Sequence, residues 1–317
     1  MATVSIIIPA YNAAATLAST LDSVLAQTYG DFDLWIVNDG SSDGTGAIAE
    51  AACAQDPRIH LLNQPNGGIA QARNHGIQAS SGELITFLDA DDLWTPDKLA
   101  DQVAALAQHP AAAVAYSWTD YIDVQGQWLY AGGREHHSGD VYGAMFCRDF
   151  VENGSNLMVR RAVLDQLGGF DTSLRSVQDW ELWLRIAAAY PFVLVPKAQI
   201  RYRIMPGSNS SNLSRQERNL RRVLEMALAR SPERLGPYRR QSLSNLYQYL
   251  TFRSLSLGQT RRQYGQSLRY LWLACLHCPA LLGQRSRLMA ITSAKILLGL
   301  VLSPAWLAGR KAAQAEA

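Results

Sequence analysis

Two carboxylates in the segment FLDADD stand two residues apart, directly after a short apolar run. Asp89 and Asp91 follow Leu84–Leu88, a run that predicts a buried strand. In an extended segment, residues two apart point to the same side, so both carboxylates can converge on one ligand. Like charges a few ångströms apart repel, and a divalent cation removes that repulsion. Because Mg²⁺ typically binds through one or two carboxylates and substrate phosphates, the pair predicts a metal site for a phosphorylated ligand.

Two further acids occupy comparable positions in the first two thirds of the chain. Asp39 follows the apolar run Leu34–Val37, and Asp179 begins a segment with helical periodicity. Each acid taken alone is equally well interpreted as a turn former or a helix cap, since Asp is common at both. Their repeated placement at successive element ends favours a shared ligand site.

Short apolar runs and helical patterns alternate along the first 110 residues. This alternation predicts a mostly parallel, Rossmann-like α/β sheet with helices on both faces, in which ligands bind beyond the carboxyl ends of the strands. One helix is predicted to have Thr95 as its N-cap and Pro96 in its first position. The predicted elements are strands Val4–Ile8, Leu34–Val37, Ile59–Leu62 and Leu84–Leu88, and helices Ala14–Gln27, Thr45–Ala54, Ala70–Ala79 and Pro96–Gln108.

The remainder of the chain is less regular and then all-helical. The net charge of +2 is unevenly distributed along the chain. Residues 1–213 carry 12 Lys and Arg against 23 Asp and Glu, and residues 214–317 carry 17 Lys and Arg against 4 Asp and Glu. We therefore expect two domains, the second of them a basic helical region that favours an anionic neighbour. Between residues 110 and 213 the predicted elements are strands Val114–Tyr121, Gln127–Tyr130 and Phe192–Arg203, and helices Arg161–Leu167 and Val177–Ala189.

Six short motifs, in one order, resemble the family 2 glycosyltransferases of the GT-A fold. The resemblance covers about residues 3–210, and it implies an inverting transfer of a sugar from a nucleoside diphosphate. The expected enzyme is a hexosyl- or N-acetylhexosaminyltransferase that uses a UDP-sugar and Mn²⁺ or Mg²⁺. The motifs are VSIIIPAYN, VNDGSSDGT, NGGIAQARNHGI, FLDADD, GGFD and QDWELWLR.

The resemblance also assigns roles to individual residues of the nucleotide and metal site. It implies that Asp39 accepts a hydrogen bond from the base, that Arg73 lies near the diphosphate, and that Asp89 faces the ribose or the metal. Asp91 is implied to be the principal protein ligand of the metal. The nucleotide pocket at the end of the first strand is implied to be lined by Pro9, Ala10 and Tyr11.

At the catalytic end of the site the chain departs from the family pattern twice. Asp179 stands where the family has its general base, but the acid that usually precedes it is replaced by Gln178. Many relatives also place a His where Met205 stands here, so Arg203 and Ser208 are the alternative contacts to phosphate or acceptor.

Two other classes of function compete with sugar transfer. A sugar nucleotidyltransferase would need a Gly-rich, basic phosphate-wrapping loop after the first strand, and PAYNAAATL offers neither. A non-catalytic nucleotide-binding assembly subunit would not need four acids at the predicted site.

The basic region leaves two interpretations open. Apolar stretches Leu271–Gly283 and Ile296–Ala308 are too short to span a membrane, but their basic flanks suit an interfacial location on an anionic leaflet. The alternative is a helical cap that packs on the catalytic domain. The N-terminus lacks a signal-peptide pattern, so a cytoplasmic location is expected, either free or peripheral on the inner face of the membrane. The expected acceptor is a saccharide or is linked to polyprenyl phosphate; nucleic acid is not an expected partner.

Overall fold

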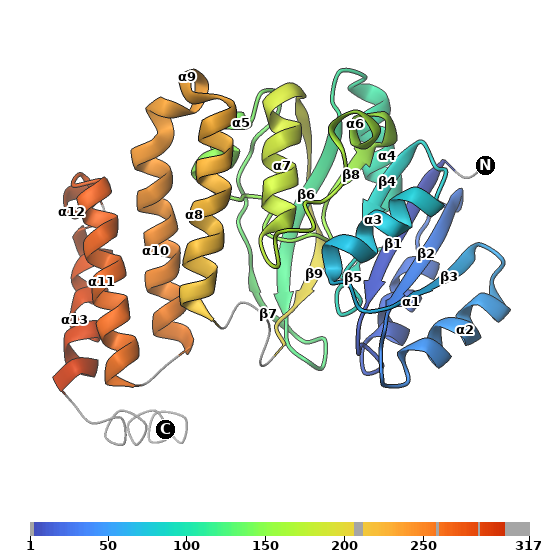
Figure 1. The fold of residues 1–317 in the computed structure, drawn as a ribbon, viewed down its shortest axis with the longest axis horizontal. Coiled ribbons are helices and arrows are strands. Elements are labelled where there is room, and N and C mark those ends of the chain that lie inside the picture. Colours follow the sequence, from blue (N-terminus) through green and yellow to red (C-terminus); the bar gives the residue numbers. More distant parts are fainter. Residues whose placement is uncertain (1–2, 206–211, 258–259, 285, 302–317) are drawn as a thin grey trace. The chain divides into compact units, whose positions relative to one another are not determined.

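The computed structural model describes residues 3–205, 212–257, 260–284 and 286–301. The chain separates into two compact units near residue 206, and residues 146–148 belong with the second unit. The first unit is built on a nine-stranded sheet, and the second is helical (Figure 1).

The parallel half of the sheet comes from the N-terminal part of the chain. Its strands are β1 (Val4–Ala10), β2 (Phe32–Asp39), β3 (Ile59–Gln64) and β4 (Leu84–Phe87), in the order β3-β2-β1-β4, and every neighbouring pair is parallel. All seven residues of β1 are buried, as expected of a β-branched strand covered on both faces. The four strands predicted in this region are confirmed.

The other half of the sheet is mixed and continues the order as β8-β6-β9-β5, with β7 paired to β6. Parallel pairing joins β6 (Val114–Ile122) to β9 (Phe192–Arg203), whereas β8 (Met158–Arg160), β5 (Leu93–Trp94) and β7 (Trp128–Ala131) pair antiparallel. The predicted α/β architecture is confirmed. The antiparallel strands β8 and β5 were not predicted, because two or three residues are too few to show a periodic pattern.

Helices cover both faces of the sheet. Alternate residues of β1 point to opposite faces: Ile6 and Ile8 face α1, whereas Ile7 meets α3 at Gly76, where an added Cβ would lie 2.5 Å from the Ile7 Cγ2 atom. Glycine therefore allows α3 to pack closely on the sheet. The helices of this unit are α1 (Leu17–Leu25), α2 (Thr45–Gln55), α3 (Ile69–Ala79), α4 (Lys98–Gln108), α5 (Tyr142–Cys147), α6 (Arg161–Leu167) and α7 (Gln178–Ala189).

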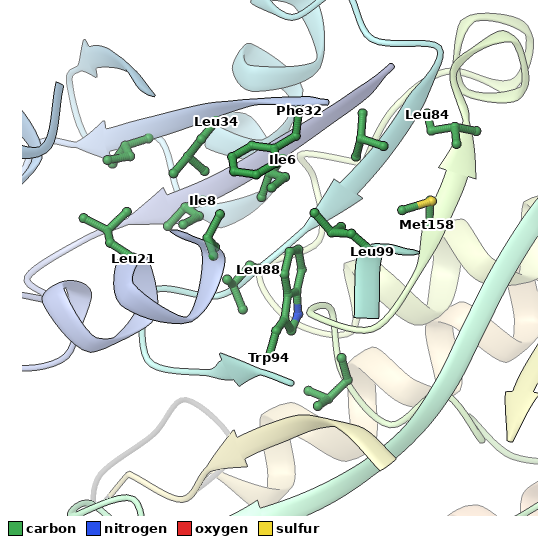
Figure 2. Close-up of a cluster of buried hydrophobic side chains, with 14 of the residues drawn as sticks. Ile6, Ile8, Leu21, Phe32, Leu34, Leu84, Leu88, Trp94, Leu99 and Met158 are labelled. Atoms are coloured by element: carbon green, nitrogen blue, oxygen red, sulfur yellow. The ribbon is translucent and has the colours of Figure 1, made fainter. Parts of the chain in front are cut away.

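One face of the sheet holds a continuous apolar core (Figure 2). Ile6 and Ile8 of β1 pack there with Leu21 of α1 and Leu99 of α4, and all four side chains are buried. Each such side chain contributes roughly 1.5–3 kcal/mol when it leaves water. This core fixes the strand ends that carry the candidate site.

The start of α4 differs from the prediction. The helix begins at Lys98 with Asp97 as its N-cap, and Thr95 donates a hydrogen bond to Asp97 Oδ1 at 2.6 Å. The predicted N-cap Thr95 is therefore wrong by two residues, because Pro96 lies in the turn that precedes the helix and not in the helix.

The second unit is all-helical, as predicted. The sequence after Ser214 also predicts one helical hairpin around Gly258, a residue that lies outside the described ones. The helices α10 (Arg239–Leu257) and α11 (Arg261–His277) on either side of it pack against each other. Thr260 and Gln263 form a reciprocal capping box at the start of α11. Among the helices that the structure describes, none has the length and apolarity needed to cross a bilayer. The helices are α8 (Leu213–Arg230), α9 (Pro232–Leu235), α10 (Arg239–Leu257), α11 (Arg261–His277), α12 (Leu281–Gln284) and α13 (Ser286–Val301).

Candidate active site

The predicted nucleotide pocket lies at the carboxyl ends of β1 and β2. Pro9 and Ala10 are the buried last residues of β1, and Tyr11 beyond them is 56% exposed. The loop that follows is held to the loop after β2: the Asn12 amide donates to Ser41 Oγ at 3.0 Å, and the Ser42 amide donates to Asn12 Oδ1 at 2.9 Å. An exposed aromatic ring on a fixed loop can receive a base or sugar.

Asp39 ends β2 and is buried among donors of its own chain. Its carboxylate accepts hydrogen bonds from Gln64 Nε2 at 2.7 Å, from the Gly67 amide at 2.8 Å and from the Gly68 amide at 2.9 Å. A carboxylate has about four acceptor positions, so this arrangement leaves little capacity for a ligand. The structure shows Asp39 fastening the segment before α3; its contact with a base stays a prediction.

The segment after β4 gathers three carboxylates. Burial and the neighbouring charge of Asp89 raise the pKa of Asp91 to about 6. Asp92 is fully buried, accepts hydrogen bonds from Ser155 Oγ at 2.5 Å and from the Arg203 amide at 2.9 Å, and has its pKa raised mainly by burial. Asp92 therefore shapes the loop, and Asp89 and Asp91 are left at the edge of the sheet.

Arg73 is a buried cation directly behind this segment. Its side chain is 1% exposed, and Nη2 donates to Asp89 Oδ1 at 2.5 Å. Within the described part of the chain, Nε and Nη1 have no hydrogen-bond partner. An added Cβ at Gly154 would lie 2.2 Å from Nη2, so glycine makes room for the guanidinium. Arg73 thus orients Asp89, and the predicted proximity to a diphosphate stays a prediction.

Asp179 lies in the first turn of α7 and belongs to the same electrostatic site. Its pKa is raised, chiefly by burial; the positive charge of Arg73 opposes the rise, and the negative charge of Asp89 adds to it. The Trp180 amide donates to Asp179 Oδ1 at 2.9 Å. Val177 precedes the helix with φ of 56°, a left-handed conformation that is strained for a β-branched residue. The sequence-predicted base is therefore brought together with Arg73 and Asp89.

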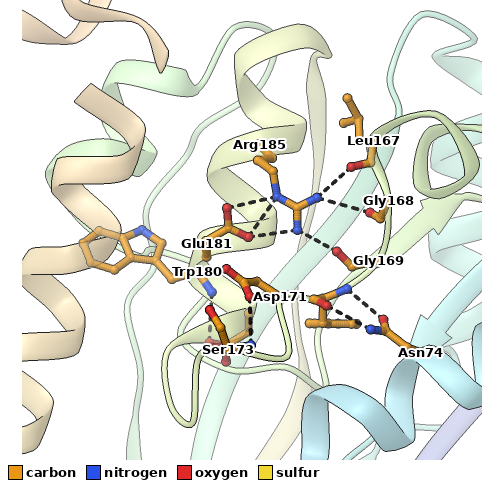
Figure 3. A network of polar contacts seen from close by, with 11 residues as sticks. Asn74, Leu167, Gly168, Gly169, Asp171, Ser173, Trp180, Glu181 and Arg185 are labelled. Atoms are coloured by element: carbon orange, nitrogen blue, oxygen red, sulfur yellow. Dashed lines mark hydrogen bonds and ion pairs between the residues drawn. The ribbon is translucent and has the colours of Figure 1, made fainter. Parts of the chain in front are cut away.

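A polar network holds the start of α7 in place (Figure 3). Glu181, 1% exposed, accepts from Arg185 Nε at 2.9 and 3.0 Å, and Arg185 also donates to the carbonyl oxygens of Leu167 and Gly169 at 2.8 and 2.6 Å. On the other side of the GGFD segment, Asn74 of α3 exchanges hydrogen bonds with the Phe170 backbone at 2.8 and 2.9 Å. We call this network the Glu181–Arg185 clasp. It links α7 to α3, the helices that carry Asp179 and Arg73.

Sequence reasoning missed an acid beside the candidate base. Burial raises the pKa of Asp149 to about 8, and the negative charge of Asp179 is the second cause. Asp149 accepts hydrogen bonds from the amides of Val151 and Glu152 at 3.2 and 3.3 Å. It lies in an irregular segment without a strand-end signal, so only the folded chain brings it to the site. Asp92, by contrast, could have been found from the sequence, since it completes the FLDADD motif.

Arg203, which was predicted to contact phosphate or acceptor, donates hydrogen bonds to backbone carbonyl oxygens. It donates from Nε to the Asp91 carbonyl at 2.7 Å and from Nη1 to the Asp123 and Val124 carbonyls at 3.3 and 3.0 Å. Arg203 thereby joins the acidic segment to the turn between β6 and β7. Ser208, the other predicted contact, lies outside the described residues.

The β6–β7 hairpin, attached to the acidic segment in this way, exposes apolar side chains. All four residues of β7 are exposed, with Trp128 at 64% and Tyr130 at 49%. Tyr121 stacks on Tyr130 at 4.7 Å and contacts Tyr202 edge-on at 5.5 Å. The pKa of Tyr202 is raised first by burial and then by the charges of the acidic segment. A row of aromatic rings therefore runs from the exposed hairpin to the carboxylates.

The donor set fits a hard divalent cation that completes its coordination with phosphate oxygens. The described residues contain no group of three or more His, Cys, Asp or Glu side chains arranged to hold a metal alone. Asp91 and Asp89 supply two carboxylates whose mutual repulsion a cation would relieve. Mg²⁺ and Mn²⁺ are suited to oxygen ligands of this kind.

Comparison with known proteins places the chain in a family. A sequence profile of glycosyl transferase family 2 matches residues 5–168, more than half of the chain. The chain belongs to this family. An uncharacterised glycosyltransferase of Rickettsia typhi is 32% identical over 195 residues, which cover 59% of this chain and 60% of that protein. Chondroitin synthase of Pasteurella multocida is 29% identical over 247 residues, which cover 77% of this chain and 25% of that protein. The chain therefore spans only part of the length of these relatives.

Solved structures share the fold of this chain. S. aureus TarS 1-349 in complex with UDP-GlcNAc superposes with a TM-score of 0.63 at 17% identity, covering 94% of this chain and 89% of that one. Mannosyltransferase PcManGT from Pyrobaculum calidifontis in complex with GDP-Man and Mn²⁺ has a TM-score of 0.58 at 19% identity, covering 95% and 87%. The predicted GT-A architecture is confirmed.

Proposed function

We propose that this glycosyltransferase moves a hexosyl or N-acetylhexosaminyl group from a nucleoside-diphosphate sugar to a saccharide or lipid-linked acceptor. The observation that carries the proposal is the ion pair of Arg73 with Asp89, together with the electrostatic influence of both on the buried Asp179 of α7. Similar structures hold UDP-GlcNAc and GDP-Man, which supports a nucleotide sugar as the donor. UDP is the expected nucleotide, and residues 1–213 are the expected catalytic domain.

The acidic segment would handle the charge of the donor. Asp91, with Asp89 beside it, would hold Mn²⁺ or Mg²⁺, and when bound the cation supplies positive charge for the departing diphosphate. Arg73 fixes the Asp89 carboxylate through its 2.5 Å contact. Asp39 fastens Gly67 and Gly68, so the wall of the nucleotide pocket is rigid before a donor arrives.

Asp179 would act as the general base. As the acceptor oxygen forms its bond to the anomeric carbon, the bond from that carbon to the diphosphate oxygen breaks, and the hydroxyl proton passes to the Asp179 carboxylate. One such displacement inverts the anomeric configuration. The raised pKa makes the carboxylate a stronger base than an exposed Asp, which suits this task.

The base assignment is tested with Asp179→Asn in the full chain. We expect turnover to fall by about 10²–10⁴-fold, the usual contribution of a general base, while nucleotide affinity stays within a factor of two. Release of nucleoside diphosphate measures turnover, and NMR of the product gives its anomeric configuration. Asp165→Asn, at an exposed position on α6, is the matched control. Undiminished turnover in Asp179→Asn would remove this residue as the base. Release of pyrophosphate from an NTP and a sugar phosphate would instead indicate a nucleotidyltransferase.

The metal assignment is tested with Asp91→Asn. We expect UDP to raise the unfolding temperature of the wild type more strongly when Mn²⁺ is present, because a ligand bound only to the folded state stabilises it. In Asp91→Asn this Mn²⁺-dependent increment should disappear, whereas Asp165→Asn should keep it. An unchanged Mn²⁺ response in Asp91→Asn would show that the cation is held elsewhere.

The acceptor side of the site is proposed to be the β6–β7 hairpin. Contiguous exposed apolar side chains usually mark an interaction surface, and aromatic rings present flat faces on which sugar rings pack. Arg203 ties the hairpin turn to the Asp91 carbonyl, so a saccharide on β7 would reach toward the carboxylates.

A further inference from the structure

A groove in the helical unit lies between α8 and α11. Its volume is about 420 Å³, within the range of small-molecule sites. Figure 1 shows α8, α10 and α11 as neighbouring rods of this unit. Four guanidinium groups and two carboxylates line the groove, which leaves an excess of two positive charges. The lining residues are Ser214, Glu217, Arg218, Arg221, Arg222, Glu225 and Arg269.

The two carboxylates of the groove differ in how firmly they are held. Glu217, with 11% of its side chain exposed, accepts hydrogen bonds from both terminal nitrogens of Arg269 at 2.9 and 3.0 Å. Glu225 is 67% exposed, and its Oε1 atom lies 3.4 Å from Arg221 Nη2, which is a long ion-pair distance in solvent. Three of the four guanidinium groups that line the groove lie on α8.

The spacing of these arginines along α8 brings like charges close together. Arg218 and Arg222 are four residues apart and Arg218 and Arg221 three apart, so their side chains share one exposed face of α8. Like charges at these spacings destabilise a helix, and a bound anion converts that repulsion into attraction. The planar fork of arginine matches phosphate oxygens in pairs, which a lysine ammonium does not.

The positive charge extends beyond the groove itself. The pKa of His277 on α11 is lowered, first by burial and then by the charges of Arg221, Arg239 and Arg240. A smaller hollow of about 40 Å³ shares Arg221 and Glu225 with the groove and adds Arg239, but its other lining residues are the apolar Phe146, Leu224, Leu228 and Leu243. Arg239 and Arg240 therefore add to the positive charge near His277, whereas the phosphate donors are those of the groove itself.

We propose that the groove between α8 and α11 binds the phosphate groups of an anionic ligand through Arg218, Arg221 and Arg222. This role goes beyond sugar transfer and does not depend on it. Both a soluble phosphate-bearing chain and the headgroups of an anionic lipid present this chemistry, and the two sources are separated by experiment.

The test compares two double variants of the full chain. Arg218→Gln with Arg222→Gln removes two groove arginines, and Arg261→Gln with Arg262→Gln removes two exposed arginines at the start of α11, outside the groove. Inorganic tripolyphosphate is titrated by calorimetry at 150 mM salt with EDTA present, so that metal-dependent binding elsewhere is absent. We expect the groove variant to bind at least about 10-fold more weakly than the wild type, and the control to change less than about 2-fold.

Vesicles distinguish the two sources of phosphate. In the same variants, sedimentation with phosphatidylglycerol vesicles is compared with sedimentation with phosphatidylcholine vesicles. Binding of tripolyphosphate or of the anionic vesicles that is lost only in the groove variant supports the proposal and identifies the source. Equal losses in the two double variants, or no binding of either probe by the wild type, would overturn it. Metal-dependent nucleoside diphosphate release should be the same in all three proteins, so failure here leaves the transferase proposal intact.

Discussion

Burial sets the protonation of the carboxyl groups around the candidate base. It is the largest cause of the raised pKa of Asp91, Asp149 and Asp179, ahead of every neighbouring charge. Arg73 is the cation that acts against this rise at Asp179. Gln178 precedes the candidate base in the sequence, and Asp149 supplies a second carboxyl group near it from elsewhere in the chain.

Asp149 should make the folded state sensitive to pH. Its pKa is about 8 in the folded protein, against an ordinary value of 3.8, so folding takes up a proton between these values. The stability from this proton is fully present below about pH 4 and is lost as the pH rises through about 8. Asp149→Asn keeps the acceptor oxygen and cannot ionise. We expect it to be more stable than the wild type by roughly 3 kcal/mol at pH 6 and by up to roughly 5 kcal/mol at pH 8, at about 1.4 kcal/mol per unit of pKa. The two should have equal stability near pH 4.

Denaturant unfolding at pH 4, 6 and 8 measures this difference, with the exposed Asp165→Asn as the control. A difference between Asp149→Asn and the wild type that is the same at all three pH values would contradict a raised pKa at this position.

Sequence could locate the carboxylates at strand ends but not their partners. The positions of Asp89 and Asp91 after an apolar run were predictable, but the expected extended geometry was wrong. The strand ends at Phe87, and Asp89–Asp92 form a turn in which the Asp92 amide donates to the Asp89 carbonyl at 3.1 Å. The three donors to Asp39 come from Gln64, Gly67 and Gly68, which lie 25, 28 and 29 residues away along the chain. Such contacts depend on the register of β2 and β3, which no local pattern contains.

At the scale of elements, α7 is positioned by polar contacts as well as by its apolar face. Trp183 packs edge-on against Phe170 at 6.0 Å, and Phe170 against Phe87 at 5.0 Å. The Glu181–Arg185 clasp holds the same GGFD segment, to which Phe170 belongs, through the carbonyl oxygens of Leu167 and Gly169. The start of α7, with Asp179 in its first turn, therefore has few alternative positions.

Breaking the clasp should affect both stability and turnover. Glu181→Gln leaves the Arg185 charge largely buried without its counter-ion, and removal of one partner of such a pair typically costs about 3 kcal/mol. We expect a loss of this size in denaturant unfolding, together with a lower kcat, because Asp179 is no longer held in place. Glu50→Gln, at an exposed site on α2, should change neither. If Glu181→Gln lost stability but kept full kcat, the clasp would have no part in positioning the base.

The β6–β7 hairpin should affect the acceptor and not the donor. Trp128→Ala combined with Tyr130→Ala removes the exposed rings of β7, and we expect the KM for an oligosaccharide acceptor to rise about 3- to 10-fold, in line with the energy of aromatic contacts. Donor hydrolysis by water should stay unchanged. Trp272→Ala on α11, where the ring is 62% exposed, controls for loss of an exposed tryptophan. An equal KM in the hairpin variant and this control would exclude β7 as the acceptor surface.

Strands with a long apolar run could be predicted from the sequence, whereas strands that form only because they pair with their neighbours could not. The runs in β1, β2, β3 and β4 are apolar and long enough to identify, and each proved to be a strand. By contrast, β8 exists because Met158–Arg160 lies between β4 and β6 and pairs with both. A three-residue segment gains this structure from its neighbours, so its own sequence is not informative.

At the scale of the whole molecule, the two parts of the sequence have opposite charge. Residues 1–213 have 11 more acidic than basic residues, although the proposed donor is itself an anion. An anionic donor needs positive charge where it binds, although this part of the chain is negative overall. The proposed cation at Asp91 and the buried Arg73 would supply that charge. The basic excess of the C-terminal region includes the arginines of the α8–α11 groove.

The left-handed Val177 has a consequence for directed evolution of this protein. A glycine there would relieve strain of roughly 1–3 kcal/mol, so a selection for heat resistance alone would favour that change. The same glycine would loosen the peptide that leads into Gln178 and Asp179. Position 177 is therefore where selection for thermostability and selection for catalysis would choose different amino acids.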